Sequence, residues 1–335
     1  MAIPDRRFRR RVTLTDIAHA CGVAPSTVSR ALSNPNRVSP EMYERIRAKA
    51  VEMGYASATL PSAGQSRARG TIGLVLPNIS NPFVFDLIRG SQAQCQAAGF
   101  LSLLISTEES AHVEQEWLRD LSRTVDGVVI ASPRTDDDAL KAIADAVPLV
   151  VINREVPGIS GIVIATPAAS VNALDYLHSL GHRRVAYVRG PETSWTDRTR
   201  LEALLPAAER NGTELVPLGA FHPSLEAGAA AADAVALSGA TASLFFNDTL
   251  AIGAMARLRH RGVRVPEDIS VIGCDDIFGA ATANPPLTTI TSPGERAGRA
   301  ATELLISQLT SKPQPRVDYL SAHLTVREST GPARV

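Results

Sequence analysis

Four polar side chains near the start of the 335-residue chain could form hydrogen bonds to a charged polymer. Ser26, Thr27, Ser29 and Arg30 surround the apolar Val28. A guanidinium can bind a guanine edge through two parallel hydrogen bonds, Ser26 can touch a base edge, and the hydroxyls of Thr27 and Ser29 suit phosphate oxygens. On a helix, Val28 would face inward and leave the polar residues outside. The segment is therefore a candidate DNA-reading helix.

The flanking residues predict two short helices joined by a tight turn, the outline of a helix-turn-helix. Thr13, with Asp16 three residues later, predicts a capping box at the start of the first helix. Gly22 supplies the turn, and Pro25 stands at the first position of the second helix. A third helix is expected to begin after Ser39, its N-cap.

Charge is distributed unevenly along the chain. Residues 1–60 contain ten Arg or Lys and five Asp or Glu, whereas the whole chain contains 34 of each. A basic head on an acidic body is expected when only the head meets phosphates. A solvated basic arm, or a plain three-helix scaffold, is the alternative without nucleic acid.

The chain resembles a known protein family along nearly its whole length. The head reads VTLTDIAHACGVAPSTVSRALSNPNRVSPEMYERIRAKAVEMGY, which resembles the head of the lactose-repressor (LacI/GalR) family. The resemblance continues through IGLVLPNISNPFVFDLIRG, VDGVVIASP, LHSLGHRRVAYVRGP, FFNDTLAIGAM, GVRVPEDISVIGCDD and NPPLTTI. It implies a homodimer, in some members a tetramer, that binds palindromic double-stranded operator DNA and a small effector, often a sugar or nucleoside. It places Pro25, Ser26 and Arg30 at base-reading positions, and Thr13, Ser29, Arg37 and Ser39 along the DNA backbone.

The segment after the head departs from the family pattern. Family members form a short hinge helix there and wedge a leucine into the minor groove, which kinks the duplex. Here Pro61 replaces an alanine and Gly64 stands at the position of the wedge leucine, so Leu60 is the large apolar side chain left nearby. Because Gly and Pro disfavour helix, we expect a weaker kink or a wedge formed by Leu60. A plain flexible linker is the alternative.

Apolar runs alternate with Ala-rich amphipathic segments from Thr71 onward, which predicts an α/β body. Runs such as TIGLVLP, VDGVVIA and ISVIGC fit buried strands of parallel sheets covered on both faces. The family fold is two-lobed, like a periplasmic binding protein. The expected organisation is a head at 1–56, a hinge at 57–70 and a body at 71–335, with lobe 1 at about 71–164 and 293–318 and lobe 2 at about 165–292 and 319–330, including a last strand over Tyr319–Thr325.

Polar residues cluster after the predicted strands, where ligands of parallel sheets bind. Carboxylate, amide and guanidinium groups beside an aromatic face are suited to a polyol. Asp248 and Asp276 could simply cap helices, and the two phenylalanines of the set could belong to the core. Asn153 stands where many family members carry aspartate. The effector-binding residues implied by the resemblance are Phe83, Asn153, Arg198, Phe221, Asn247 and Asp275, with Trp195 close by.

Other classes of protein are less favoured by the residues. No P-loop, GxSxG or HExxH motif is present, the three cysteines are scattered, and His182 fits a structural role better than a metal site. We therefore expect no enzyme activity, no metal and no cofactor. Apolar runs of strand length and the absence of a signal-like segment predict a cytoplasmic protein without a membrane partner.

The favoured function is a repressor of a carbohydrate or nucleoside utilisation operon. A small effector bound between the two lobes would release it from the operator. A corepressor-dependent repressor is the main alternative. A sugar-binding protein or an enzyme without a DNA role is the other.

Overall fold

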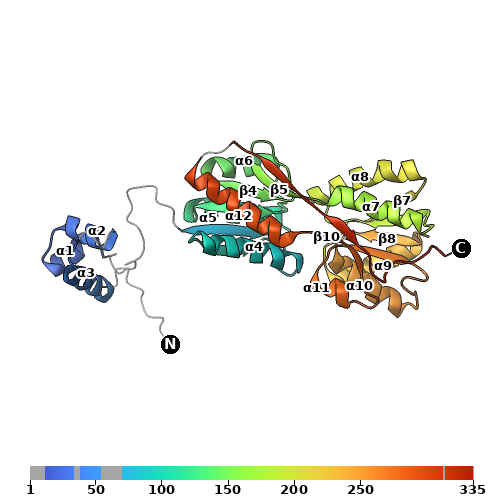
Figure 1. Ribbon diagram of the computed structural model, residues 1–335, viewed down its shortest axis with the longest axis horizontal. Helices are drawn as coiled ribbons and strands as arrows, with labels where there is room; N and C mark the ends of the chain where they lie inside the picture. Colours follow the sequence, from blue (N-terminus) through green and yellow to red (C-terminus); the bar gives the residue numbers. More distant parts are fainter. Residues whose placement is uncertain (1–11, 34–37, 54–69, 312–313, 335) are drawn as a thin grey trace, which may run out of the picture. The chain divides into compact units, whose positions relative to one another are not determined.

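The computed structural model describes residues 12–33, 38–53, 70–311 and 314–334. The chain divides into two compact units, Met1–Arg69 and Gly70–Val335. Figure 1 shows the three helices of the first unit in blue and the α/β body of the second in the remaining colours.

The described part of the first unit contains three short helices with local signals at their starts. Thr13 and Asp16 form the predicted capping box, because each side chain binds the backbone of the other residue. Gly22 ends the first helix in the left-handed conformation, at φ 64°. Ser39 Oγ accepts from the Met42 N–H at the third helix, at 3.3 Å. The helices are α1 (Leu14–Cys21), α2 (Pro25–Ser33) and α3 (Pro40–Glu52).

One apolar core holds these three helices together. Ile17 of α1, Val28 and Ala31 of α2, and Ile46 and Ala50 of α3 are buried against one another. Val28 and Ala31 are three residues apart, which puts them on one side of α2, and the burial of Val28 agrees with the sequence prediction. The polar face of α2 therefore remains on the outside of this unit.

The body contains two six-stranded sheets, and each forms the centre of one lobe. The first sheet is parallel throughout, with strand order β11-β5-β4-β3-β1-β2. The second has the order β12-β10-β9-β8-β6-β7, and its β10–β12 pair is antiparallel. The strands of the first sheet are β1 (Thr71–Leu76), β2 (Leu101–Ser106), β3 (Gly127–Ala131), β4 (Leu149–Ile152), β5 (Ser160–Ala165) and β11 (Val317–Ser321); those of the second are β6 (Arg184–Val188), β7 (Glu214–Leu218), β8 (Ala242–Phe245), β9 (Ser270–Asp275), β10 (Thr288–Thr291) and β12 (His323–Thr325).

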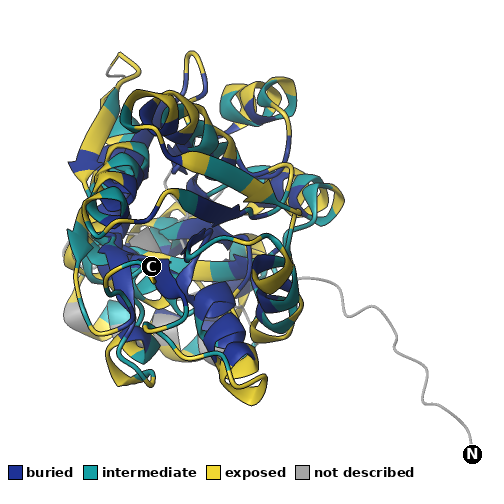
Figure 2. Cartoon of the chain, turned by 90° about the vertical axis from the view of Figure 1, so that its right-hand side faces the viewer, coloured by how far each residue is buried: buried dark blue, intermediate teal, exposed yellow. Residues whose placement is uncertain are grey.

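Helices cover both faces of each sheet, as the alternating pattern predicts. In lobe 1, Leu74 faces α4 and α12, whereas its neighbour Val75 faces the side covered by α5 and α6. In lobe 2, Tyr187 faces α7 and α8, and Val188 faces α9 and α10. Figure 2 shows the central strands in dark blue and the outward sides of the helices in yellow. The helices are α4 (Phe83–Ala97), α5 (Ala111–Thr124), α6 (Asp137–Ala146), α7 (Thr166–Ser179), α8 (Trp195–Asn211), α9 (Leu225–Leu237), α10 (Asp248–His260), α11 (Phe278–Thr282) and α12 (Gly294–Thr310).

The last strand of the chain differs from the sequence prediction. Tyr319–Thr325 was expected to be one strand of lobe 2, but Val317–Ser321 pairs with β5 in lobe 1 and His323–Thr325 pairs with β10 in lobe 2. The physical reason is packing: Leu320 is buried in the core of lobe 1, and Leu324 packs against that of lobe 2. Lobe 1 therefore extends to Ser321, and Ala322 contacts both cores. The red ribbon crossing between the lobes in Figure 1 is this segment.

The chain also crosses between lobes after β5 and after β10, so three connections join them. Each connection starts at the carboxyl end of a strand, namely β5, β10 or β11, so the site expected at these strand ends lies between the lobes. No helix in the described residues is both long and apolar enough to span a membrane.

Two glycines allow α9 and α10 to pack closely. A Cβ added at Gly228 would overlap the carbonyl oxygen of Leu250, and one at Gly253 would overlap that of Leu225. We expect Gly253→Ala to lower the free energy of unfolding by about 1–3 kcal/mol, because the helices must separate to admit the methyl group. Urea unfolding checks this, with Glu226→Ala on the exposed side of α9 as control. Equal losses in both variants would contradict the close-packing explanation.

Candidate functional site

The outer face of α2 carries the predicted DNA-reading residues. Pro25, Ser26 and Arg30 are exposed, and Thr27 and Ser29 are half-buried. Arg30 donates from Nε to the Ser26 carbonyl at 3.1 Å and from Nη2 to Ser26 Oγ at 3.4 Å, so its guanidinium lies along its own helix. These exposed side chains can exchange such bonds for bonds to a duplex.

Thr13 and Ser39 lie at the starts of α1 and α3, where each caps a helix. Both are exposed, so a phosphate could approach the same helix N-termini. Arg37 and Leu60, together with the atypical hinge residues Pro61 and Gly64, lie outside the described residues. The DNA-contacting roles of this set stay predictions.

A cavity of about 50 Å³ lies between the two lobes, at the carboxyl ends of their strands. It is lined by four of the seven residues predicted to bind an effector: Phe83 and Asn153 from lobe 1, and Asn247 and Asp275 from lobe 2. Asn153 directly follows β4 and Asp275 is the last residue of β9, and both have positive φ, at 59° and 116°. Residues with strained backbone are common at ligand-binding sites. Such a conformation costs free energy and persists only where the surrounding structure holds it.

Arg198 does not line this cavity, and Arg200 does. The reason is helical geometry: Thr196 and Arg200 are one turn apart on α8 and both face the cavity, whereas Arg198 projects about 200° away. The side chain of Arg198 is 62% exposed and lies 3.9 Å from Glu202. Placing the guanidinium of the site at Arg198 was therefore wrong for this cavity, and Arg200 provides it.

Trp195 and Phe221 also lie outside the lining of the cavity. Trp195 is the half-buried first residue of α8, and Phe221 packs at the margin of the lobe 2 core. Their contact with an effector remains a prediction.

Four residues that line the cavity each have a buried side-chain atom with no hydrogen-bond partner within the described residues. These atoms are Arg200 Nε, Asn247 Nδ2, Thr166 Oγ1 and Ser292 Oγ. The rest of each side chain is well held: Arg200 Nη1 donates to the Phe246 carbonyl at 2.7 Å, and Asn247 Oδ1 accepts from the Leu250 N–H at 3.0 Å. Buried polar groups rarely remain unpaired, so this arrangement is typical of a site for a polar ligand.

Asn247 caps α10 through its side-chain oxygen and also lines the cavity, and its contact with an effector stays a prediction. Asp248 and Asp276 have structural partners instead. Asp248 accepts from Thr289 Oγ1 at 2.6 Å, and Asp276 pairs with Arg327 at 2.6 Å. Neither of them lines the cavity.

Asp275 and Arg200 place opposite charges on the lobe 2 wall. Loss of solvation raises the pKa of the Asp275 carboxyl to about 7, while Arg200 and the Cys274 thiol oppose the increase. Arg200 also stacks over the Phe246 ring, 4.9 Å from its centre. The wall thus combines a fixed cation, a titratable acid and an aromatic face.

The raised pKa of Asp275 predicts a pH dependence of stability. Between pH about 4 and about 7 the folded chain keeps a proton that the unfolded chain releases, so stability falls as pH rises through this window. Asp275→Asn should remove this loss in the free energy of unfolding, which is on the order of 2–4 kcal/mol. The variant should therefore exceed the natural chain in stability most clearly at pH 8. Urea unfolding at pH 5 and pH 8 measures it, with the exposed Asp138→Asn as control. Identical pH slopes for Asp275→Asn and the natural chain would contradict the assignment.

Two lining residues on lobe 1 escaped the sequence analysis. Arg134 follows β3, and its guanidinium binds Glu109 through Nε and Nη2, each 2.6 Å from one carboxylate oxygen. Both side chains are buried. Arg134 comes directly after the run VVIASP, so the strand-end rule that selected Asn153 could also have selected it.

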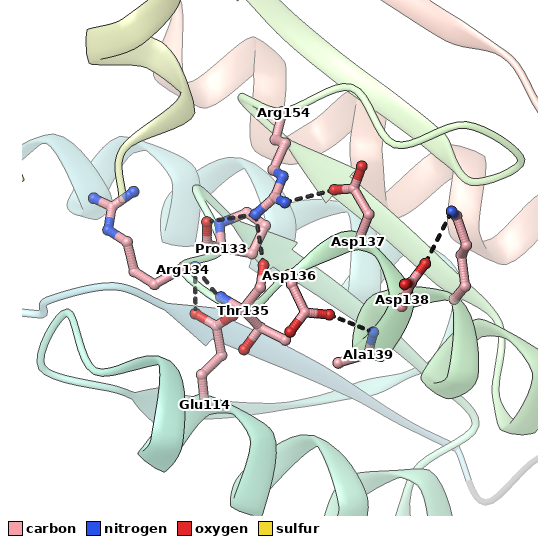
Figure 3. Close-up of polar contacts among 10 residues, drawn as sticks. Glu114, Pro133, Arg134, Thr135, Asp136, Asp137, Asp138, Ala139 and Arg154 are labelled. Carbon is pink, nitrogen blue, oxygen red and sulfur yellow. Dashed lines mark hydrogen bonds and ion pairs between the residues drawn. The ribbon is translucent and has the colours of Figure 1, made fainter. Parts of the chain in front are cut away.

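A network of polar contacts fixes the loop that carries Arg134 (Figure 3). Glu114 of α5 accepts from the backbone N–H groups of Arg134 and Thr135, at 3.1 and 2.9 Å. Arg154 donates to the Thr135 carbonyl at 2.6 Å and binds Asp137 at 2.5 Å. Burial raises the pKa of Glu114, and the two backbone N–H groups oppose this. Glu114 thus holds the loop through two backbone N–H groups, and Arg154 holds it through a backbone carbonyl.

The histidine considered as a metal ligand has structural partners. His182 is buried, and its ring nitrogens contact Thr241, Ser270 and the Gly331 carbonyl at 2.8–3.1 Å. Across the described part of the chain, no three His, Cys, Asp or Glu residues are grouped to hold a metal ion.

Comparison with known proteins finds relatives across the whole chain. Residues 13–57 match the model for bacterial regulatory proteins of the lacI family, and 174–330 match a periplasmic binding protein-like domain. The HTH-type transcriptional regulator DegA of Bacillus subtilis (strain 168) is 30% identical over 96% of this chain and 99% of its own. The HTH-type transcriptional repressor CytR of Escherichia coli (strain K12) is 31% identical over 89% of each chain. The solved complex of the transcriptional regulator CelR with cellobiose has a TM-score of 0.71 and 28% identity, over 95% of this chain and 100% of that one.

A helix-turn-helix unit joined to a two-lobed, periplasmic-binding-protein-like body defines a DNA-binding transcriptional regulator. The chain belongs to the lacI family of bacterial regulatory proteins.

Proposed function

We propose that this regulator is a repressor that a small polar effector releases from its operator. The observation that carries the proposal is the interlobe cavity. Within the described residues, its lining residues Arg200, Asn247, Thr166 and Ser292 each have a buried side-chain atom without a hydrogen-bond partner. These residues belong to lobe 2, and Phe83 and Asn153 line the lobe 1 side of the same cavity, so a ligand held there would contact both lobes. It would therefore favour one relative position of the lobes over others.

A sugar or a nucleoside is the proposed class of effector. Two unpaired nitrogen donors and two hydroxyls are matched by ligand oxygens, and Phe83 and Phe246 offer apolar planes to the rest of a ring. The name of the CelR structure includes cellobiose, which supports a carbohydrate. A carbohydrate or nucleoside utilisation operon is the corresponding target.

We propose that the operator is palindromic and that two copies of the chain bind it. The edge strand β2 exposes Leu101 and Leu103, and the neighbouring segment and α4 expose Ile79 and Phe85. An apolar edge of this kind suits association of two copies about a two-fold axis. Two heads related by that axis would read two half-sites, with Arg30 binding guanine in each.

The effector would act through the difference between its affinities for the two positions of the lobes. Closing the cavity would change the distance between the two DNA-binding heads of a dimer. Binding to two half-sites depends on that distance. The protein would act in the cytoplasm, where it would bind operator DNA. It would catalyse no reaction, because it would bind and release the effector unchanged.

Gel-shift assays with fragments of the source genome test the proposal. The expected result is a fragment that the full chain retards at moderate ionic strength and that one sugar or nucleoside releases. A fragment retarded only when the compound is present would instead indicate corepression. Failure to retard any fragment at low ionic strength, with or without the compounds, would overturn the function.

A further inference from the structure

The lobe 1 wall of the cavity contains a buried ion pair that no part of the proposed function uses. The side chains of Arg134 and Glu109 are 3% and 8% exposed, and both line the cavity. The guanidinium contacts Glu109 Oε2 through both Nε and Nη2, at 2.6 Å each. A pair with these distances and this burial is held firmly, because separating it would leave two buried charges unpaired.

The backbone on both sides is built to present this pair. Glu109 has a φ of 60°, a conformation that costs free energy in a residue with a side chain, and its N–H donates to the Pro77 carbonyl at 2.7 Å. Arg134 lies on the loop held by Glu114 and Arg154, and Figure 3 shows its guanidinium extending away from Glu114. Neither side chain can move far without loss of these contacts.

The pair determines how much positive charge the cavity offers to a ligand. Four charged side chains line the cavity: Arg134 and Arg200, and Glu109 and Asp275. When Asp275 is ionised the two signs balance. A phosphate or carboxylate brought into this space would find one guanidinium already bound to Glu109 and would lie beside two carboxylates. An uncharged polyhydroxyl ligand meets no such penalty.

We propose that the Arg134–Glu109 pair makes the interlobe cavity selective for uncharged polyhydroxyl ligands, because Glu109 occupies the guanidinium that would otherwise bind a phosphate or carboxylate. The inference rests on the proposed function, since it assumes that the effector binds in this cavity. Within the candidate classes, it favours free sugars and nucleosides over their phosphates and over sugar acids.

Removing the carboxylate charge tests the inference. The probes are matched compounds: ribose and ribose 5-phosphate, glucose, glucose 6-phosphate and gluconate, and cytidine and its 5′-monophosphate. Thermal-shift titrations use the full chain at pH 8, where Asp275 is ionised. The natural chain should be stabilised by at least one neutral compound and not by its charged counterpart. In Glu109→Gln, the affinity for the charged compound relative to the neutral one should rise by about tenfold or more. The reason is that the Arg134 guanidinium becomes free to form a charge-assisted hydrogen bond with the ligand.

Two further variants make the result specific. Glu108→Gln removes the same charge one residue earlier, where the side chain is exposed and outside the cavity, and should leave the ratio unchanged. The double variant Glu109→Gln/Arg134→Gln keeps two side chains that can hydrogen-bond to each other but has no guanidinium on lobe 1. It should lose the gain in anion affinity, and it keeps the test open if Glu109→Gln alone folds poorly.

The outcomes separate the two proposals. Equal or tighter binding of the charged compound by the natural chain, or an unchanged ratio in Glu109→Gln, would overturn the selectivity while leaving an effector site in place. An equal gain in Glu108→Gln would overturn it as well, because general charge would then be the cause. No stabilisation of the natural chain by any compound would overturn the effector site itself, and the selectivity with it.

Discussion

Arg30→Ala is expected to remove most of the preference of the protein for its operator while leaving the fold of the head intact. The side chain is exposed, and within the described residues its hydrogen bonds go to Ser26 on the same helix, so no core contact is lost there. A bidentate pair with guanine contributes about 1–3 kcal/mol of discrimination for each copy. A dimer with two such heads should lose operator affinity by two orders of magnitude or more, roughly twice that free energy.

Gel shifts on the operator and on a scrambled duplex, at one fixed salt concentration, measure this loss. Lys49→Ala is the matched control, because it removes one positive charge from α3, where Lys49 pairs with Glu52 at 2.9 Å. The control should weaken binding to both duplexes alike. If Arg30→Ala retains the natural ratio between the two duplexes, Arg30 reads no base.

The head could be predicted in detail because its signals are local. The Thr13–Asp16 capping box, the turn at Gly22 and the helix start at Pro25 each depend on residues within one turn of each other. Such contacts follow from sequence spacing alone. The buried side of α2 followed in the same way from the spacing of its apolar residues.

The body could be predicted in outline, since alternating buried runs and amphipathic segments define parallel sheets with two covered faces. The division of its last strand could not. Tyr319 belongs to a strand of lobe 1 and Leu324 to one of lobe 2, and the run of residues between them contains no turn signal. Only the partner strands, β5 and β10, determine where that segment changes sheet.

The site was predicted best where strands end. Asn153 and Asp275 were found by that rule, and both line the cavity. The rule gives no information on which face of a helix points inward, and Arg200 was missed for that reason. The Glu109–Arg134 pair was missed for another: it joins residues from two loops, and only the fold brings them within 2.6 Å.

Arg200→Met is expected to weaken the response to the effector strongly, whereas Arg198→Met should preserve it. Methionine keeps the apolar stem of the side chain and removes the buried guanidinium, whose Nε has no hydrogen-bond partner within the described residues. A hydrogen bond to a charged group contributes about 1.5–3 kcal/mol, so ligand affinity should fall by roughly tenfold to a hundredfold.

The comparison is matched because both changes remove one arginine from the same helix, two residues apart. Arg198 is 62% exposed and Arg200 is 4% exposed, so only the second change alters the cavity. The measurement is the effector concentration that releases half of the operator fragment in a gel shift, together with the ligand-induced thermal shift. Because Arg200 also binds the Phe246 carbonyl, its loss lowers stability as well, and the shift is therefore measured relative to the unliganded variant. A lost response in Arg198→Met with a normal one in Arg200→Met would place the effector outside this cavity, on the exposed side of α8.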